Sequence, residues 1–124
     1  MTVRRLEILQ WTGFLLGGVV WFAEYLAGTG VSVAVCNPAS SRWGIPNDAV
    51  VLGLGSFAFG CLLVAELAAI AVFRATSAED EQGPPPSARM KFFATASIAA
   101  NVIFAMIVVL TTVASVVDRT CHQA

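Results

Sequence analysis

Residues 92–117 read FFATASIAANVIFAMIVVLTTVASVV, a run of 26 residues without a charged side chain. The hydrocarbon core of a bilayer is about 30 Å thick, and about 20 apolar residues in a helix cross it. A segment in lipid has no water for its backbone groups, so it must bond them internally, as an α-helix does. The run therefore predicts a transmembrane helix.

Two further runs of similar length precede it. Residues 8–35 and 49–73 each contain one charged side chain, Glu24 and Glu66 respectively. Of the chain's 124 residues, 57% are hydrophobic and 12% are charged, and the mean hydropathy is +0.78. This composition is typical of a membrane protein. We therefore expect a single all-α membrane domain, a bundle of three transmembrane helices.

The remaining segments are too short to bury a soluble core of their own. They are an outer loop at 36–48, a proline-rich cytoplasmic loop at 74–91 and an outer tail at 118–124. Arg4 and Arg5 before an apolar run resemble the start of a signal peptide. The run is too long for one and lacks a small-residue cleavage site, so we expect a retained helix.

Positive charges set the expected orientation. Three spans place the N-terminus and the loop at 74–91 on one side of the membrane, with five of the seven Lys and Arg residues. These five are Arg4, Arg5, Arg74, Arg89 and Lys91, against Arg42 and Arg119 on the other side. Cytoplasmic segments carry the excess of positive charge. We predict a cytoplasmic N-terminus and an external C-terminus in a bacterial plasma membrane.

This topology brings two of the three cysteines to the outer face. Cys36 follows the first span and Cys121 follows the third. Outside a bacterial plasma membrane the compartment is oxidising, so a disulfide between them is predicted. Two unpaired thiols are the alternative. Cys61 lies inside the second span, where a small packing residue is the simplest interpretation, and the three cysteines show no metal-site spacing.

Three polar residues within the spans are the candidate functional positions. A charge at the bilayer centre costs about 2.5 to 3.5 kcal/mol, so Glu24 and Glu66 need partners. They differ in depth by about 13 Å at 1.5 Å per residue and are not expected to pair. Asn101 lies near the depth of Glu66, which predicts a hydrogen bond between them. A bond to a neighbouring subunit, proton transfer, or a Glu24 side chain that reaches the outer interface beside Tyr25 are the alternatives.

Small residues at four-residue spacing mark places where helices can approach closely. Each span has one such pair: Gly13 and Gly17, Ser56 and Gly60, and Ala96 and Ala100. The spacing does not say whether the facing helix belongs to this chain or to another. It does favour a compact bundle with helix-to-helix contacts.

Signatures of catalysis are lacking in the sequence. The single histidine, His122, lies near the C-terminus, and no span has a histidine to bind haem. We expect no catalytic residue, no metal ligand and no cofactor-binding residue in this chain. Lipid and larger membrane subunits are the expected partners, and nucleic acid is not.

Several features follow one another along the chain in this order: Trp21 and Tyr25 late in the first run, Cys36 after it, a proline-containing loop, then Phe93, Asn101, Phe104 and Cys121. In this order the chain resembles the small three-helix membrane proteins that accompany haem-copper cytochrome c oxidases in bacterial operons. The resemblance covers the whole chain. It implies a non-catalytic accessory subunit of a respiratory complex, with haem and copper in its partners.

Two other functions compete with the accessory role. One is a homo-oligomeric channel or transporter in which Glu24 or Glu66 lines the pore. The other is an assembly factor that binds the oxidase only transiently. A fixed stoichiometry in a mature complex would exclude the second, and a symmetric particle of this chain alone would favour the first.

Overall fold

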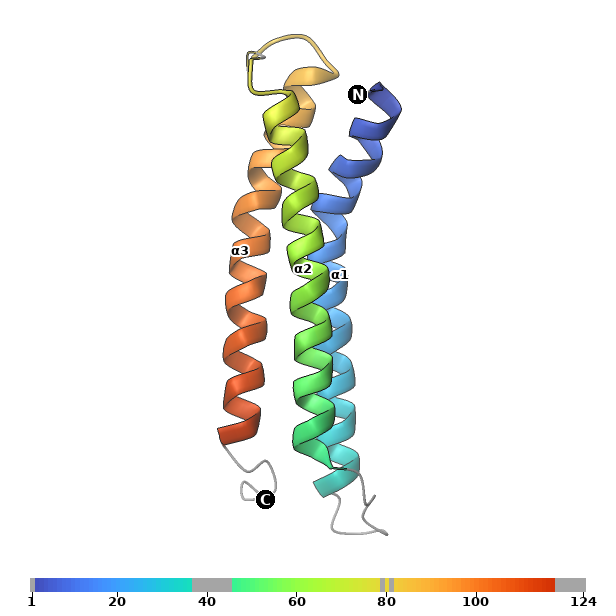
Figure 1. The fold of residues 1–124 in the computed structure, drawn as a ribbon, viewed down its shortest axis with the longest axis vertical. Coiled ribbons are helices and arrows are strands. Elements are labelled where there is room, and N and C mark those ends of the chain that lie inside the picture. Colours follow the sequence, from blue (N-terminus) through green and yellow to red (C-terminus); the bar gives the residue numbers. More distant parts are fainter. Residues whose placement is uncertain (1, 37–45, 79, 81, 118–124) are drawn as a thin grey trace.

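The computed structural model describes residues 2–36, 46–78, 80 and 82–117, and within them the chain forms three long α-helices. Helix α1 spans Val3–Cys36, α2 spans Asn47–Ala75 and α3 spans Ser87–Val117. They lie side by side, with α2 antiparallel to the other two (Figure 1). The N-terminal end of the bundle is the end at which α1 begins. The C-terminal end is the opposite one, at which α1 and α3 both finish.

Each helix is long and apolar enough to cross a membrane. The 34 residues of α1 correspond to about 50 Å at 1.5 Å per residue, well beyond a hydrocarbon core of about 30 Å. The prediction of an all-α fold, with three helices that are long and apolar enough to span a membrane, is confirmed. The chain has the architecture of a multi-pass membrane protein.

The helices begin earlier than the apolar runs that predicted them. Helix α1 starts at Val3 rather than residue 8, and α3 starts at Ser87 rather than residue 92. Charged residues such as Arg4 and Lys91 end an apolar run, but they are good helix formers and continue the backbone hydrogen bonding beyond the lipid. The connection between α2 and α3 therefore comprises residues 76–86, which is shorter than the predicted loop at 74–91.

Helix α2 supplies most of the buried core, and its buried face consists mainly of small residues. They are Val51, Gly55, Ala58, Leu62, Ala65, Ala68, Ala69 and Val72. Toward the C-terminal end, Ala58 and Leu62 cluster with Val108 of α3. Toward the N-terminal end, Val72 clusters with Met90 and Ala94 of α3. Small side chains on α2 let both neighbouring helices approach its backbone.

Glycines mark the closest approaches between helices. A Cβ at Gly13 of α1 would lie 3.0 Å from the backbone nitrogen of Ala69 and 3.1 Å from its Cβ. A Cβ at Gly17 would overlap the Oδ1 atom of Asn101, and one at Gly55 of α2 would overlap the hydroxyl of Thr112 on α3. Gly13 and Gly17 therefore form a packing face against other helices of this chain, which their spacing alone left open.

The other two small-residue pairs lie differently. Ser56 and Gly60 are exposed on α2, and a Cβ at Gly60 would meet no atom within 4 Å. Ala96 and Ala100 of α3 are half-buried. The buried face of α2 contains Gly55 in place of Ser56. Because small residues occur all around this helix, the spacing alone did not identify the face that turns inward.

Cys36 is the last residue of α1 and is disulfide-bonded. Cys61, half-buried within α2, is a free thiol. Cys121 lies outside the described residues, so its predicted pairing with Cys36 stays a prediction. The ends of α1 and α3 share the C-terminal end of the bundle, as that pairing requires (Figure 1).

Candidate functional site

Asn101 is the central polar residue of the bundle. It lies in the middle of α3 and is 3% exposed. Its Nδ2 atom donates a hydrogen bond of 3.0 Å to the backbone carbonyl oxygen of Gly13 on α1. The absence of a side chain at Gly17, one helical turn further along, leaves room for the Asn101 amide. Together, Gly13 and Gly17 therefore allow the Asn101 side chain of α3 to reach the α1 backbone.

The same amide reaches α2. Asn101 forms a side-chain hydrogen bond with the Glu66 carboxyl group. The Oε2 atom of Glu66 is buried, and no hydrogen bond reaches it within the described part of the chain. Asn101 therefore links all three helices at one level, through a backbone carbonyl on α1 and a carboxyl on α2. Interhelical hydrogen bonds of this kind stabilise helix bundles in membranes, where burial of apolar side chains adds little to the association of helices.

Replacing Asn101 by alanine is expected to lower the free energy of unfolding by about 1 kcal/mol, in the range measured for interhelical hydrogen bonds in membranes. The measurement is reversible unfolding in mixed SDS and mild detergent, followed by tryptophan fluorescence. Thr95→Ala on the same helix is the control, because Thr95 is exposed and its hydroxyl donates to the backbone carbonyl oxygen of Lys91 in its own helix. Equal midpoints for the two variants would contradict the role of Asn101.

Glu24 lies apart from this network. It is 9% exposed, and within the described residues no hydrogen bond or ion pair reaches its carboxyl group. Its neighbour Tyr25 is 53% exposed. The Glu24 side chain is therefore largely covered within the bundle, whereas that of Tyr25 is half exposed. The alternative in which Glu24 reaches the outer membrane interface beside Tyr25 stays a prediction.

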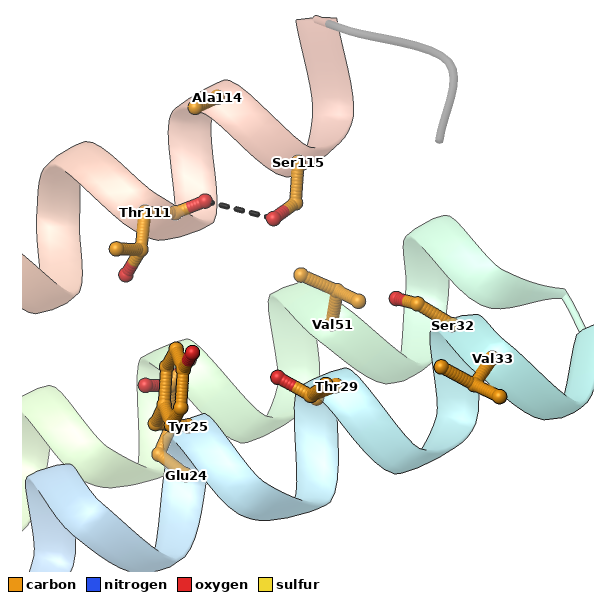
Figure 2. A pocket seen from close by; sticks show the side chains of 10 residues that line it. Glu24, Tyr25, Thr29, Ser32, Val33, Val51, Thr111, Ala114 and Ser115 are labelled. Carbon is orange, nitrogen blue, oxygen red and sulfur yellow. Dashed lines mark hydrogen bonds between the residues drawn. The ribbon is translucent and has the colours of Figure 1, made fainter. Parts of the chain in front are cut away.

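Glu24 lines a pocket of about 370 Å³ in the C-terminal half of the bundle. All three helices contribute to the pocket, with Val51 as the contribution of α2. Figure 2 shows Glu24, Thr29 and Ser32 on α1 and, across the pocket, Thr111 and Ser115 on α3. The pocket thus combines one carboxyl group with several hydroxyl groups between apolar walls.

The hydroxyl groups on the two sides of the pocket differ in their bonding. On α3, Thr111 donates to the carbonyl oxygen of Ile107 at 2.9 Å, and Ser115 donates to that of Thr111 at 2.8 Å. On α1, no hydrogen bond involves the hydroxyls of Thr29 or Ser32 among the described residues. The α1 side of the pocket therefore has polar groups available to an occupant.

Aromatic rings join α1 to α3 beside these polar groups. Trp21 stacks on Phe104 with centroids 5.3 Å apart, and on Tyr25 with centroids 6.4 Å apart. Nearer the N-terminal end, Phe93 packs against Phe14 at 5.2 Å. The aromatic rings thus contribute to the packing of the bundle. Several of them pack between α1 and α3, and the Tyr25 ring also borders the Glu24 pocket.

Among the described residues, no group of three or more His, Cys, Asp or Glu side chains is arranged to hold a metal ion. A second, apolar pocket of about 260 Å³ lies between α2 and α3 at Gly55 and Thr112. The described residues that line this second pocket include no charged side chain, so the Glu24 pocket is the stronger candidate site. Comparisons with protein-family models, with curated proteins and with solved structures found no match to this chain.

Proposed function

We propose that this chain is a non-catalytic accessory subunit that binds a larger membrane protein of a bacterial respiratory complex, a haem-copper cytochrome c oxidase. The supporting observation is an exposed indentation on α2 formed by Gly53, Ser56 and Gly60, which we call the α2 notch. A Cβ at Gly53 or at Gly60 would meet no atom within 4 Å. Small residues at this spacing are where transmembrane helices dock on one another.

The surroundings of the α2 notch fit a docking site for another helix. Phe57 and Phe59 are 70% and 38% exposed and flank the notch. The opposite face of α2 already contacts α1 and α3 through its buried residues. In lipid, association gains little from apolar burial and depends on close packing, which an indentation between two large side chains provides. The proposed occupant is a helix of the larger subunit.

The proposed orientation has the N-terminal end of the bundle in the cytoplasm. Arg4 and Arg5 begin α1, Arg74 ends α2, and Arg89 and Lys91 begin α3. The fold therefore collects these five positive charges at one end, which the distribution of Lys and Arg in membrane proteins assigns to the cytoplasmic side. The Glu24 pocket then lies in the outer half of the membrane.

The test is purification from the native membrane in mild detergent, with identification of the co-migrating chains and a visible spectrum. We expect haem-bearing subunits to co-migrate with the wild-type chain at a fixed ratio. Gly60→Leu fills the α2 notch with a bulky side chain and is expected to remove most of the haem-bearing partner. Gly30→Leu is the matched control, since Gly30 is exposed on α1 and a Cβ there would also meet no atom within 4 Å.

Other outcomes would replace this proposal. A colourless particle of this chain alone would favour the homo-oligomeric channel or transporter. The specific supporting feature is the Glu24 carboxyl, which has no hydrogen bond to any described residue. Glu66 fits that role less well, because it is hydrogen-bonded to Asn101 inside the bundle. Partner subunits present only during assembly, and missing from the mature complex, would favour the assembly factor.

A further inference from the structure

The pocket in the C-terminal half of the bundle presents an unusual combination of groups for a protein interior in lipid. Among the described residues that line it, Glu24 is the only charged one. The side chain is 9% exposed, and within the described chain no group donates a hydrogen bond to its carboxyl. A buried carboxylate needs a cation or donors to offset the loss of water. The described residues lining the pocket do not supply a cation.

The size of the pocket restricts what can supply that cation. At about 370 Å³ it falls within the range of small-molecule sites. A bare calcium or magnesium ion would need about six oxygen ligands at close range. One carboxylate, with no second acidic side chain among the described lining residues, does not make such a cage. An organic cation fits both the volume and the single charge.

The remaining lining residues match an organic ammonium group. The Tyr25 ring borders the pocket next to Glu24, and aromatic faces attract ammonium cations. The hydroxyls of Thr29 and Ser32 lie one and two helical turns beyond Glu24, toward the end of α1 (Figure 2). They form a polar path between the end of the bundle and the carboxyl. The other walls, such as Val51, are apolar and suit the carbon substituents of the ligand.

We propose that this pocket binds a small organic ammonium group, with Glu24 as its counter-ion and Tyr25 as its aromatic wall. The group belongs either to a free amine or to the headgroup of a lipid. Either source would present the same ammonium group to Glu24 and Tyr25. Binding at this pocket does not depend on the α2 notch, which lies on the exposed surface of α2.

The test uses the full-length chain in phosphatidylglycerol nanodiscs with benzyltrimethylammonium as the probe, measured as equilibrium binding above empty nanodiscs. Trp21, whose ring centroid lies 6.4 Å from that of Tyr25, gives a second readout by fluorescence. We expect saturable binding that Glu24→Gln weakens by about tenfold or more. Neopentylbenzene, the uncharged carbon isostere of the probe, should not compete.

Two further variants separate the site from the general stability of the fold. Glu66→Gln removes the other carboxyl of the spans and should leave binding within about twofold of wild type. Gly28→Leu fills the pocket while retaining Glu24, since Gly28 lines the pocket and a Cβ there would meet no atom within 4 Å. It should weaken binding as Glu24→Gln does. Circular dichroism checks that each variant is folded.

A second series in nanodiscs that also contain phosphatidylcholine separates the two sources of the ammonium group. Competition by the choline headgroup would support a lipid ligand, and unchanged probe affinity would support a free amine. The proposal is overturned if Glu24→Gln binds the probe as tightly as wild type. It is equally overturned if neopentylbenzene competes as well as the cation, or if no saturable binding occurs.

Discussion

Gly17→Leu is expected to detach α1 from the other two helices, with a loss of about 3 kcal/mol or more in the free energy of unfolding. A Cβ at this position would already overlap the Oδ1 atom of Asn101, and it would lie 3.2 Å from Cδ2 of Leu62. The three further carbons of leucine have no space between the helices. The change also displaces the Asn101 amide from Gly13, which removes an interhelical hydrogen bond of 3.0 Å.

The measurement is again reversible unfolding in mixed SDS and mild detergent. Gly30→Leu is the matched control, because it places the same side chain on the same helix where no atom lies within 4 Å of a Cβ. It should unfold within about 0.5 kcal/mol of wild type. If the two variants proved equally stable, the contact between α1 and Asn101 described above would be incorrect.

Loss of the predicted disulfide between Cys36 and Cys121 is expected to have the second large effect. The bond would close a loop of about 85 residues, and the chain-entropy account gives about 4 kcal/mol for such a loop. In a membrane the separated helices remain inserted and are already restricted, so this value is an upper bound. Cys36→Ser should loosen the C-terminal end of the bundle, where α1 and α3 both end (Figure 1).

Mass analysis of non-reduced peptides identifies the bond directly and should show Cys36 joined to Cys121. Unfolding with and without reductant then measures its contribution. Cys61→Ser is the control, since Cys61 is a free thiol within α2, and reductant should affect this variant as it affects wild type. Free thiols at both Cys36 and Cys121 would rule out the pairing and call the proposed compartment into question.

The sequence contained enough information for the fold class and for part of the site. Three apolar runs of sufficient length are decisive in a bilayer, because lipid forces the backbone of each run into a helix. The Gly13 and Gly17 pair also identified a real contact. The depth of Asn101, close to that of Glu66, followed from the rise per residue alone, and the structure joins these two side chains.

Three other features depended on the tertiary structure. It decided that Gly55 and Ala58, rather than Ser56 and Gly60, turn inward on α2. It also placed Glu24 in the lining of a pocket formed by all three helices, and it directed the Asn101 amide to a carbonyl group 88 residues away.

The physical reason is the solvent. In water, an apolar stripe identifies the buried face of a helix, because the other face must be polar. In lipid both faces are apolar, so the pattern along each run determines that a helix crosses the membrane and says little about its rotation. The rotation is set by close packing at small residues and by a few polar groups that must find partners. The sequence by itself therefore determined three spanning helices, and only their packing decided which residues form the core and the site.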